Sequence, residues 1–472
     1  MIPSPARLAV TAIAAAVLAG CSLTPELVRP QAPVAPAFPP HAAAAPGLTP
    51  ARAAVDIGWR EFFTDARLQS LIASALENNR DLRTAALRIE EARAQYNVQS
   101  ADLLPNLNGV GSATRTRTPA GASPLGRAVN TTVYQVGLSL ASFELDFFGR
   151  VRSLNEAALA AYLATEEAQR AAQISLVAET AKAYLSELGA GEQLVLAQRT
   201  LQSREEGYKL AKQRFDVGAS SALDLRLQET LVQSARVSVL TLQRQQAQAR
   251  NALTLLVGAP LQNLPAGADL SSQNVITAIP AGLPSDLLTN RPDIRAAESR
   301  LVAANANIGA ARAAFFPRIS LTAALGSASR ELSGLFDSGT MSWSFAPQLT
   351  LPIFDAGRNR GNLDLAVVRR DLAVTDYERT IQGAFREAAD ALVARGTLEE
   401  QVEAQRLVRE AQADRLKLAD QRFRAGVSSS LDVLDAQREL FTAEQNLVQT
   451  RLLRLTNAVD VYRTLGGGLK VE

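Results

Sequence analysis

Few residues of this chain have the type and spacing that chemistry requires. The sequence holds a single cysteine, Cys21, and a single histidine, His41. One cysteine cannot form an intrachain disulfide, and these two residues alone cannot build a Cys/His zinc site. No Cys-His or Ser-His-Asp catalytic set is expected either, because the only histidine lies in a tail rich in proline and alanine. The sequence therefore argues against an enzyme and predicts no metal site.

Cys21 points instead to acylation. Residues 1–20 carry one charge, Arg7, followed by an apolar run from Leu8 to Leu18 and then by small residues. This order is typical of a secretory signal peptide, and the apolar run is too short to span a bilayer. The segment ends in Leu18-Ala19-Gly20-Cys21, which resembles the bacterial lipobox, whose cysteine is acylated and becomes the first residue of the mature protein. The alternative is an incidental cysteine beside a cleavage site.

The residues that follow Cys21 indicate a destination and a tether. Ser22 resembles the outer-membrane sorting choice, because an aspartate at this position is typical of inner-membrane retention. A stretch rich in proline and alanine comes next, so we expect residues 21–60 to form a lipid-anchored, extended tether. No later run approaches 18 uninterrupted apolar residues, so no transmembrane helix is expected.

A second group with chemical potential lies near the C-terminus. Leu431, Asp435 and Arg438 are spaced four and three residues apart, which places them on one face of a helix. In a symmetric assembly the leucine would form an apolar ring, and Asp-Arg pairs would hold neighbouring helix tips together. The alternative is an ordinary surface ion pair with no further role.

An internal repeat shows which elements position these residues. Lys209–Gly218 aligns without gaps on Lys417–Gly426, and seven of the ten positions are identical. The next seven residues of each copy share Ser, Ser, Leu and Asp, so Asp224 matches Asp432. Earlier landmarks recur in the same order, as expected for a duplicated unit. Gly218 and Gly426 end each copy's long helix, and glycine suits such a cap because it accepts positive φ.

Each repeat is expected to contain a helix, a β-hairpin, a very long helix and a returning helix. Between Pro124 and Pro260 there is no proline, and helix formers run from Val151 to Phe215. At 1.5 Å per residue such a helix reaches about 100 Å, which is typical of a coiled bundle. The expected segments are a first repeat at 61–258 (hairpin about 107–142), a linker at 259–282, a second repeat at 283–467 (hairpin about 319–353) and a tail at 468–472.

Four short stretches alternate strictly between apolar and small polar residues. The clearest runs from Met341 to Ile353; the others are Ile319–Gly326, Tyr134–Leu140 and a more polar stretch at about Leu107–Thr118. Strands with one apolar face suit an outer-membrane barrel, with lipid outside and water inside. A soluble hairpin that packs one face on helices has the same periodicity, but the acylation motif favours the membrane.

Strand number then predicts an oligomer. Four strands cannot close into a barrel, and an open sheet edge in lipid leaves backbone groups unsatisfied. Two chains would give about eight strands and a pore filled by side chains, whereas three would give about twelve and a channel. A trimer is therefore favoured if the pore conducts solutes.

Longer motifs, in order along essentially the whole chain, resemble the TolC family of outer-membrane factors, and most closely the OprM-like lipoproteins that serve RND-type drug pumps. The motifs are Leu18–Cys21, Asp56–Phe63, Glu77–Asp81, Glu144–Arg150, Arg291–Asp293, Ala313–Pro317, Leu351–Phe354 and Leu465–Gly468. The resemblance implies a mainly α-helical chain with transmembrane β-strands. In this TolC-like duct a trimeric, twelve-stranded β-barrel, with four strands per protomer, continues into a long periplasmic α-helical barrel with a mixed equatorial region.

The resemblance also implies a function. Such a duct is the outer-membrane exit of a tripartite multidrug efflux pump in Gram-negative bacteria. Its partners are a periplasmic adaptor and an inner-membrane RND transporter, and it has no cofactor beyond the lipid on Cys21. Positions that match Leu431, Asp435 and Arg438 line the closed aperture in the family, so these residues are the expected channel gate. The expected tip loops carry Gly218, Asp224, Gly426 and Asp432.

Other functions remain open on the sequence alone. The same duct would serve for heavy-metal ions or secreted polypeptide, although the chain lacks His, Met or Cys clusters. A periplasmic coiled-coil lipoprotein without a pore is a third class, but it leaves the alternating hairpins unexplained. Lysine and arginine total 49 against 47 acidic residues, so the charge gives no reason to expect a nucleic-acid partner.

Overall fold

The computed structural model of the chain describes residues 22–38, 52–273, 275, 279–280, 282 and 284–471. The expected signal peptide, Cys21 and His41 lie outside the described residues. The chain divides into two compact units. One comprises Met1–Gln31, Arg88–Thr165 and Ala296–Tyr377, and the other comprises Ala32–Leu87, Glu166–Arg295 and Glu378–Glu472. Each unit therefore contains segments from both halves of the sequence.

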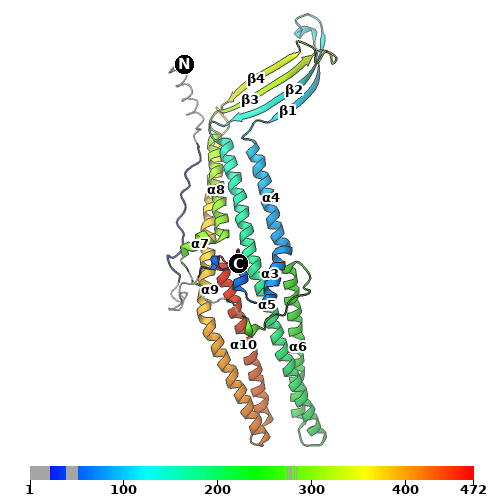
Figure 1. Cartoon of the computed structure of the whole chain (residues 1–472), viewed down its shortest axis with the longest axis vertical. Coiled ribbons are helices and arrows are strands. Elements are labelled where there is room, and N and C mark those ends of the chain that lie inside the picture. The colour runs from blue at the N-terminus through cyan, green and yellow to red at the C-terminus, as the bar shows by residue number, and fades with distance from the viewer. Residues whose placement is uncertain are drawn as a thin grey trace. The chain divides into compact units, whose positions relative to one another are not determined.

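The first unit contains a four-stranded antiparallel sheet in the order β1-β2-β3-β4 (Figure 1). The strands are β1 (Leu107–Thr118), β2 (Val129–Leu145), β3 (Arg318–Ser329) and β4 (Met341–Thr350). The loops within the two hairpins lie at one end of the sheet, and the helices leave it at the other end. The four expected strands are confirmed, and the hairpins of the two repeats pair through β2 and β3.

The strand ends differ from the expected hairpins in two places. β2 continues to Leu145 through an irregularity between Leu140 and Phe143, where Ser142 has a φ of 49°. The extra residue returns Phe143 to the face of Leu140. β4 ends at Thr350, although the alternating pattern suggested Ile353, because Pro352 has no N–H to donate to a ladder.

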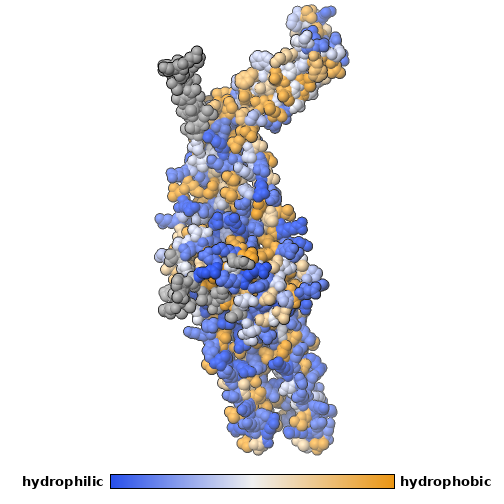
Figure 2. Space-filling view, in the orientation of Figure 1, coloured by the Kyte–Doolittle hydropathy of each residue, from blue (hydrophilic) through white to orange (hydrophobic). Residues whose placement is uncertain are grey.

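One face of the sheet is apolar and exposed within the single chain. The β2–β3–β4 register aligns Leu138 with Leu325 and Leu325 with Trp343 in one cross-strand row. All three side chains are more than half exposed, as is Phe345. Figure 2 shows hydrophobic residues gathered over these strands. A large exposed apolar face of this kind is typical of a surface that contacts lipid or another chain.

The helices recur in the same order in both repeats. The first contains α3 (Ala66–Asn78), α4 (Arg80–Ala101), α5 (Arg150–Asp216) and α6 (Ala222–Val257). The second contains α7 (Pro284–Asn290), α8 (Pro292–Ala313), α9 (Arg358–Arg424) and α10 (Ser430–Thr464). α5 and α9 each have 67 residues, about 100 Å of helix, as expected. No helix of the described residues is long and apolar enough to cross a membrane.

The N-terminal segment is extended but docked. Within residues 22–38 there is no helix or strand. The Thr24 and Ser153 hydroxyls are 3.1 Å apart, the amide of Asn305 donates to the Pro25 carbonyl at 2.8 Å, and Arg29 pairs with Glu298. The segment is thus extended, as expected for a tether, and is held along α8 and the start of α5.

The end of the expected tether lies inside the second unit's core. η2 (Ala54–Asp56) and α2 (Trp59–Phe62) are short helices, so a tether running to residue 60 extends too far. Trp59 and Phe62 are buried, and the Phe62 ring stacks on that of Tyr462 with centroids 4.0 Å apart. These apolar aromatic groups form the core together with the end of α10, because burying them stabilises the fold more than extension in water would. Two further short 3₁₀ helices are η3 (Ala120–Ala122) and η4 (Leu270–Ser272).

Candidate functional site

The turn between α9 and α10 depends on a glycine at its centre. Gly426 has a φ of 71°, and its N–H donates to the Phe423 carbonyl at 3.0 Å. The N–H of Val427 donates to the Arg422 carbonyl at 2.9 Å. This pair of bonds is the Schellman motif, which satisfies the last carbonyls of a helix and requires a left-handed residue. The expected cap role of Gly426 is therefore confirmed.

Asp432 has a local structural task. Its carboxylate accepts a hydrogen bond from the Ser429 N–H at 3.2 Å, at the start of α10. A carboxylate in the first turn also interacts favourably with the positive end of the helix dipole. Asp432 therefore fixes where α10 begins, and with it the position of the residues one and two turns further on.

Asp435 connects two arginines at this tip. The Arg438 Nη2 donates to one oxygen of its carboxylate at 2.6 Å, and Arg415 of α9 donates to the other, also at 2.6 Å. The bond to Arg438 lies within α10, whereas the bond to Arg415 crosses the hairpin. The Arg438 side chain is 66% exposed and Leu431, one turn before Asp435, is 61% exposed. The structure thus brings Asp435 and Arg438 together and leaves Leu431 free to contact another surface.

Sequence reasoning missed Arg415, although a signal was present. In an antiparallel hairpin, residues equally far from the turn lie opposite one another. Arg415 and Asp435 are each ten residues from Ala425, the last residue before Gly426. Arg409 of α9 and Glu444 of α10 form a further ion pair across the hairpin, at 3.7 Å.

The first hairpin has the same turn. Gly218 has a φ of 74°, and the Ala219 N–H donates to the Arg214 carbonyl at 2.7 Å. Ser221 caps α6, where its hydroxyl accepts from the Asp224 N–H at 3.1 Å and donates to the Asp224 carboxylate at 2.9 Å. The two expected tip turns are thus built alike.

Beyond the turn the first hairpin lacks the charged bridge. At the 208-residue offset of the repeat, Arg415 corresponds to Gly207, Asp435 to Leu227 and Arg438 to Thr230. None of these three first-repeat residues can form an ion pair. The first hairpin joins its helices elsewhere, through Arg236 and Glu205 at 3.1 Å, and the carboxylate held by two arginines belongs to the second hairpin.

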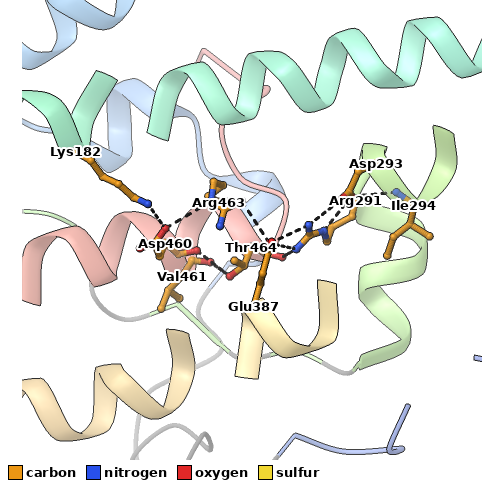
Figure 3. Close-up of polar contacts among 9 residues, drawn as sticks. All are labelled: Lys182, Arg291, Asp293, Ile294, Glu387, Asp460, Val461, Arg463 and Thr464. Carbon is orange, nitrogen blue, oxygen red and sulfur yellow. Dashed lines mark hydrogen bonds and ion pairs between the residues drawn. The ribbon is translucent and has the colours of Figure 1, made fainter. Parts of the chain in front are cut away.

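The opposite end of α10 carries a second polar cluster (Figure 3). Arg291, whose side chain is 9% exposed, binds Asp293 through two nitrogens at 3.0 and 2.6 Å. It also donates to Glu387 of α9 at 3.2 Å and to the Thr464 carbonyl at 3.5 Å. These contacts join α8, α9 and the last turn of α10. Although burial alone would lower it, the pKa of the Arg291 guanidinium is raised by the hydrogen bonds and charge of Asp293 and Glu387.

The cluster extends to α5. Arg463 contacts both Glu387, at 3.4 Å, and Asp460, at 3.6 Å, and Lys182 of α5 reaches Asp460 at 2.5 Å. Figure 3 shows these side chains converging from separate ribbons around the end of α10. A connected set of bridges holds the end of α10 more firmly than isolated surface pairs would.

A buried carboxylate also connects separate segments in the first repeat. Asp65, which is 8% exposed, accepts hydrogen bonds from Tyr184 at 2.9 Å, from Gln273 at 2.5 Å and from the Ala268 N–H at 3.1 Å. Burial alone would raise the pKa of Asp65, but these donors outweigh burial and hold the pKa below its ordinary value. Burial, together with the hydrogen bond to Asp65, raises the pKa of the Tyr184 hydroxyl.

The described residues contain no group of three or more His, Cys, Asp or Glu side chains placed to hold a metal ion. The charged side chains at the hairpin tip are instead occupied with one another. Their arrangement braces a helix turn and presents an exposed leucine.

The chain is similar to known proteins over almost its whole length. The family model described as outer membrane efflux protein matches twice, at residues 71–259 and 283–467. The chain is 50% identical over 464 residues to the toluene efflux pump outer membrane protein TtgF of Pseudomonas putida, covering 96% of this chain and 95% of that protein. It is 49% identical over 454 residues to the outer membrane protein OprJ of Pseudomonas aeruginosa, covering 96% and 94%.

Solved structures give the same result. A membrane protein from Pseudomonas aeruginosa superposes with a TM-score of 0.88 at 48% identity, covering 94% of this chain and 100% of that one. The open state of the MtrE outer membrane channel from Neisseria gonorrhoeae has a TM-score of 0.87 at 43% identity, with 96% and 99% covered. The fold is therefore that of a TolC-like duct.

Proposed function

We propose that this chain, which belongs to the outer membrane efflux protein family, assembles as a trimer and acts with a periplasmic adaptor and an inner-membrane RND transporter. Membership of the family makes it an outer-membrane efflux channel protein, in agreement with the expectation from sequence. The single observation that best supports the assembly is the sheet. Its four strands are too few to close a barrel, and β1 and β4 each leave one edge unpaired within the chain.

The cargo is the next part of the proposal. The relative TtgF is named as part of a toluene efflux pump, and another relative, ArpC of Pseudomonas putida, as part of an antibiotic efflux pump at 47% identity. We infer that this chain exports small organic compounds of that kind. The duct carries out no chemistry of its own, and the transporter supplies the energy.

Gene deletion in the native host tests the duct. Retention of a fluorescent efflux dye should rise in the deletion strain and return to the parental level with a plasmid carrying the wild-type chain. A matched plasmid that lacks only the α9–α10 tip, residues 415–438, should fail to restore export. Unchanged retention in the deletion strain would contradict drug efflux and favour metal or polypeptide cargo.

The lipid on Cys21 is part of the same proposal. The lipobox-like Leu18–Cys21 supports it, and residues 22–29 follow as an extended segment docked on α8. Intact mass of the purified protein should show removal of residues 1–20 and added acyl mass. A Cys21→Ser variant should lack that acyl mass; equal masses apart from the substitution itself would exclude acylation at this residue.

The gate is proposed at the α9–α10 tip. In each protomer Asp435 holds Arg415 and Arg438, and the exposed Leu431 meets its copies at the aperture. Exposed bridges contribute roughly 0.5 kcal/mol each. Both bridges lie within one chain, so together they stabilise each hairpin, and the position of Leu431 on it, by about 1 kcal/mol. A contribution of this size is weak enough for an adaptor to overcome.

A further inference from the structure

The outward face of β1 changes from apolar to basic along the strand. Its side chains on the face shared with Leu138 and Tyr134 are Leu107, Gly109, Gly111, Ala113, Arg115 and Arg117. The first four are apolar or lack a side chain, and the last two are arginines. Both arginines are exposed. The change occurs toward the hairpin loops, away from the helices.

The pairing of β1 with β2 shows where the arginines lie relative to the apolar band, which is the set of rows on this face that carry large apolar side chains. Ala113 pairs with Tyr134, Arg115 with Thr132 and Arg117 with Asn130. Tyr134 is therefore in the last row that contributes a large apolar group from β2. The two arginines occupy the next two rows on the same face.

The height of the band fits a bilayer. Leu145 and Tyr134 of β2 pair with Ile319 and Ser329, which are ten residues apart on β3, so a rise of about 3.3 Å per residue gives about 33 Å along the strand. With the tilt of about 40° typical of outer-membrane barrels, this spans about 25 Å across the membrane. That distance matches the hydrocarbon thickness of about 25 to 30 Å. Arg115 and Arg117 then lie at the level of the headgroups.

The charge of the first hairpin is of one sign. The sequence contains no acidic residue between Asp102 and Glu144, whereas Arg115, Arg117 and Arg127 all lie in that interval. In the described part of the chain, neither Arg115 nor Arg117 forms an ion pair. Two unpaired cations above an apolar face attract an anion that sits at the membrane surface.

We propose that Arg115 and Arg117 bind the phosphate groups of the glycolipid in the outer leaflet of the membrane. Arginine presents a planar fork of N–H donors that matches phosphate oxygens. Residues two apart on one strand face are about 7 Å apart, which allows both guanidinium groups to contact one phosphorylated sugar headgroup. The inference rests on the outer-membrane placement of the sheet and not on the transported cargo.

Native mass spectrometry of the full-length protein in detergent tests the binding. The probes are lipid A with two phosphates, its monophosphoryl form, phosphatidylglycerol and phosphatidylcholine. The wild-type protein should retain bisphosphorylated lipid A in preference to the other three. The R115Q/R117Q double variant should bind it about 30-fold more weakly, given about a tenfold loss for 1.4 kcal/mol and about 1 kcal/mol per arginine.

A face-exchange variant is the matched control. T114R/R115T/T116R/R117T keeps the composition and charge of β1 but moves both arginines to the opposite face of the strand. It should lose lipid A binding as the double variant does, while R127Q, in the loop, should change it less than about threefold. Circular dichroism verifies the fold of each variant, and the double variant carries the test if the exchange does not fold.

Several outcomes would overturn the proposal. They are unchanged lipid A binding in the double variant, wild-type binding in the face-exchange variant, or equal retention of phosphatidylglycerol. Dye export separates this inference from the proposed function. If the double variant loses lipid binding but still exports the dye, the arginine site is supported independently of export. If the wild-type protein binds lipid A but deletion of its gene leaves dye retention unchanged, only the efflux proposal is contradicted.

Discussion

At the core ends of α6 and α10 the two repeats make the same contacts. The backbone of Gly258 lies against the Asn78 carbonyl, and that of Gly466 lies against the Asn290 carbonyl. Both glycines have positive φ, 71° and 88°. The residue after each of these asparagines also donates a hydrogen bond to a carbonyl near the end of the returning helix. Asn79 donates to the Leu256 carbonyl at 2.9 Å, and Arg291 donates to the Thr464 carbonyl.

At the tips the repeats differ. The second hairpin joins its two helices through Arg415 and Asp435, and the first has Gly207 and Leu227 at the equivalent positions. The duplicated unit therefore keeps the contacts that anchor its returning helix and varies those that control the tip. Equivalent substitutions should thus have similar effects at the anchors and different effects at the tips.

The largest effect is expected at the shared anchors. A Cβ at Gly258 would lie 2.5 Å from the Asn78 carbonyl oxygen, and one at Gly466 would lie 2.9 Å from that of Asn290. Valine also disfavours positive φ, so Gly258→Val and Gly466→Val should each cost about 3 kcal/mol or more. Thermal unfolding followed by circular dichroism measures the loss. Similar losses in both repeats sharpen the comparison.

A helical glycine provides the control. A Cβ at Gly383 of α9 would have no neighbouring atom within 4 Å beyond the backbone of its own helix. Gly383→Ala should leave stability unchanged or raise it by about 1 kcal/mol, because alanine favours helix. If Gly258→Val were as harmless as this control, the anchor would not depend on the close contact.

A medium effect is expected from Asp65, which anchors the first repeat. Its pKa in the fold lies below the ordinary value, so the ionised form is stabilised by folding. This contribution is fully present above about pH 4 and is lost as the pH falls through the lower, folded pKa. Asp65→Asn should cost about 2 kcal/mol at neutral pH.

Thermal midpoints between pH 7 and pH 3 measure the dependence. The wild-type protein should lose stability in the acidic part of the range more steeply than Asp65→Asn, since the variant lacks the titrating group. Asp414, an exposed carboxylate of α9, provides the control through Asp414→Asn. Parallel curves for all three proteins would show that Asp65 does not link pH to folding.

A smaller effect is expected when the second tip's bridge is built into the first. Gly207→Arg with Leu227→Asp places an Arg-Asp pair at the positions of Arg415 and Asp435. A Cβ at Gly207 lies 3.5 Å from the nearest heavy atom, so the space permits a side chain. The pair should stabilise the first hairpin by about 1 kcal/mol, from helix propensity and the new bridge. Amide hydrogen exchange at the start of α6 should slow, and unchanged exchange would contradict the transfer of the bridge.

Sequence reasoning reached the fold through features with strong local causes. The repeat, the long proline-free segments and the tip glycines each fix backbone geometry, and all were found in the structure. The strand ends were predicted less accurately. An irregularity near Ser142 interrupts the alternation in β2, and β4 ends before Pro352 although the alternating pattern continues. The expected tether was too long because the burial of Phe62 depends on a distant partner, Tyr462.

The tip was predicted only in part for the same physical reason. Leu431, Asp435 and Arg438 share a helix face, and helix periodicity alone shows this. Arg415 lies on the other helix, so finding it requires the register of the hairpin as well. The cluster around Arg291 draws on four separate segments, and no local pattern in the sequence indicates that they meet.

The central claim is that the bridged tip of the second repeat holds the duct closed, and single-channel conductance in planar bilayers tests it most directly. The D435A/R438A variant should open more often or conduct more than the wild-type protein, with a shift in open population of about fivefold for the roughly 1 kcal/mol lost at each tip. The matched first-repeat variant L227A/T230A should behave like the wild type. Unchanged conductance in D435A/R438A, or an equal rise in L227A/T230A, would contradict the account.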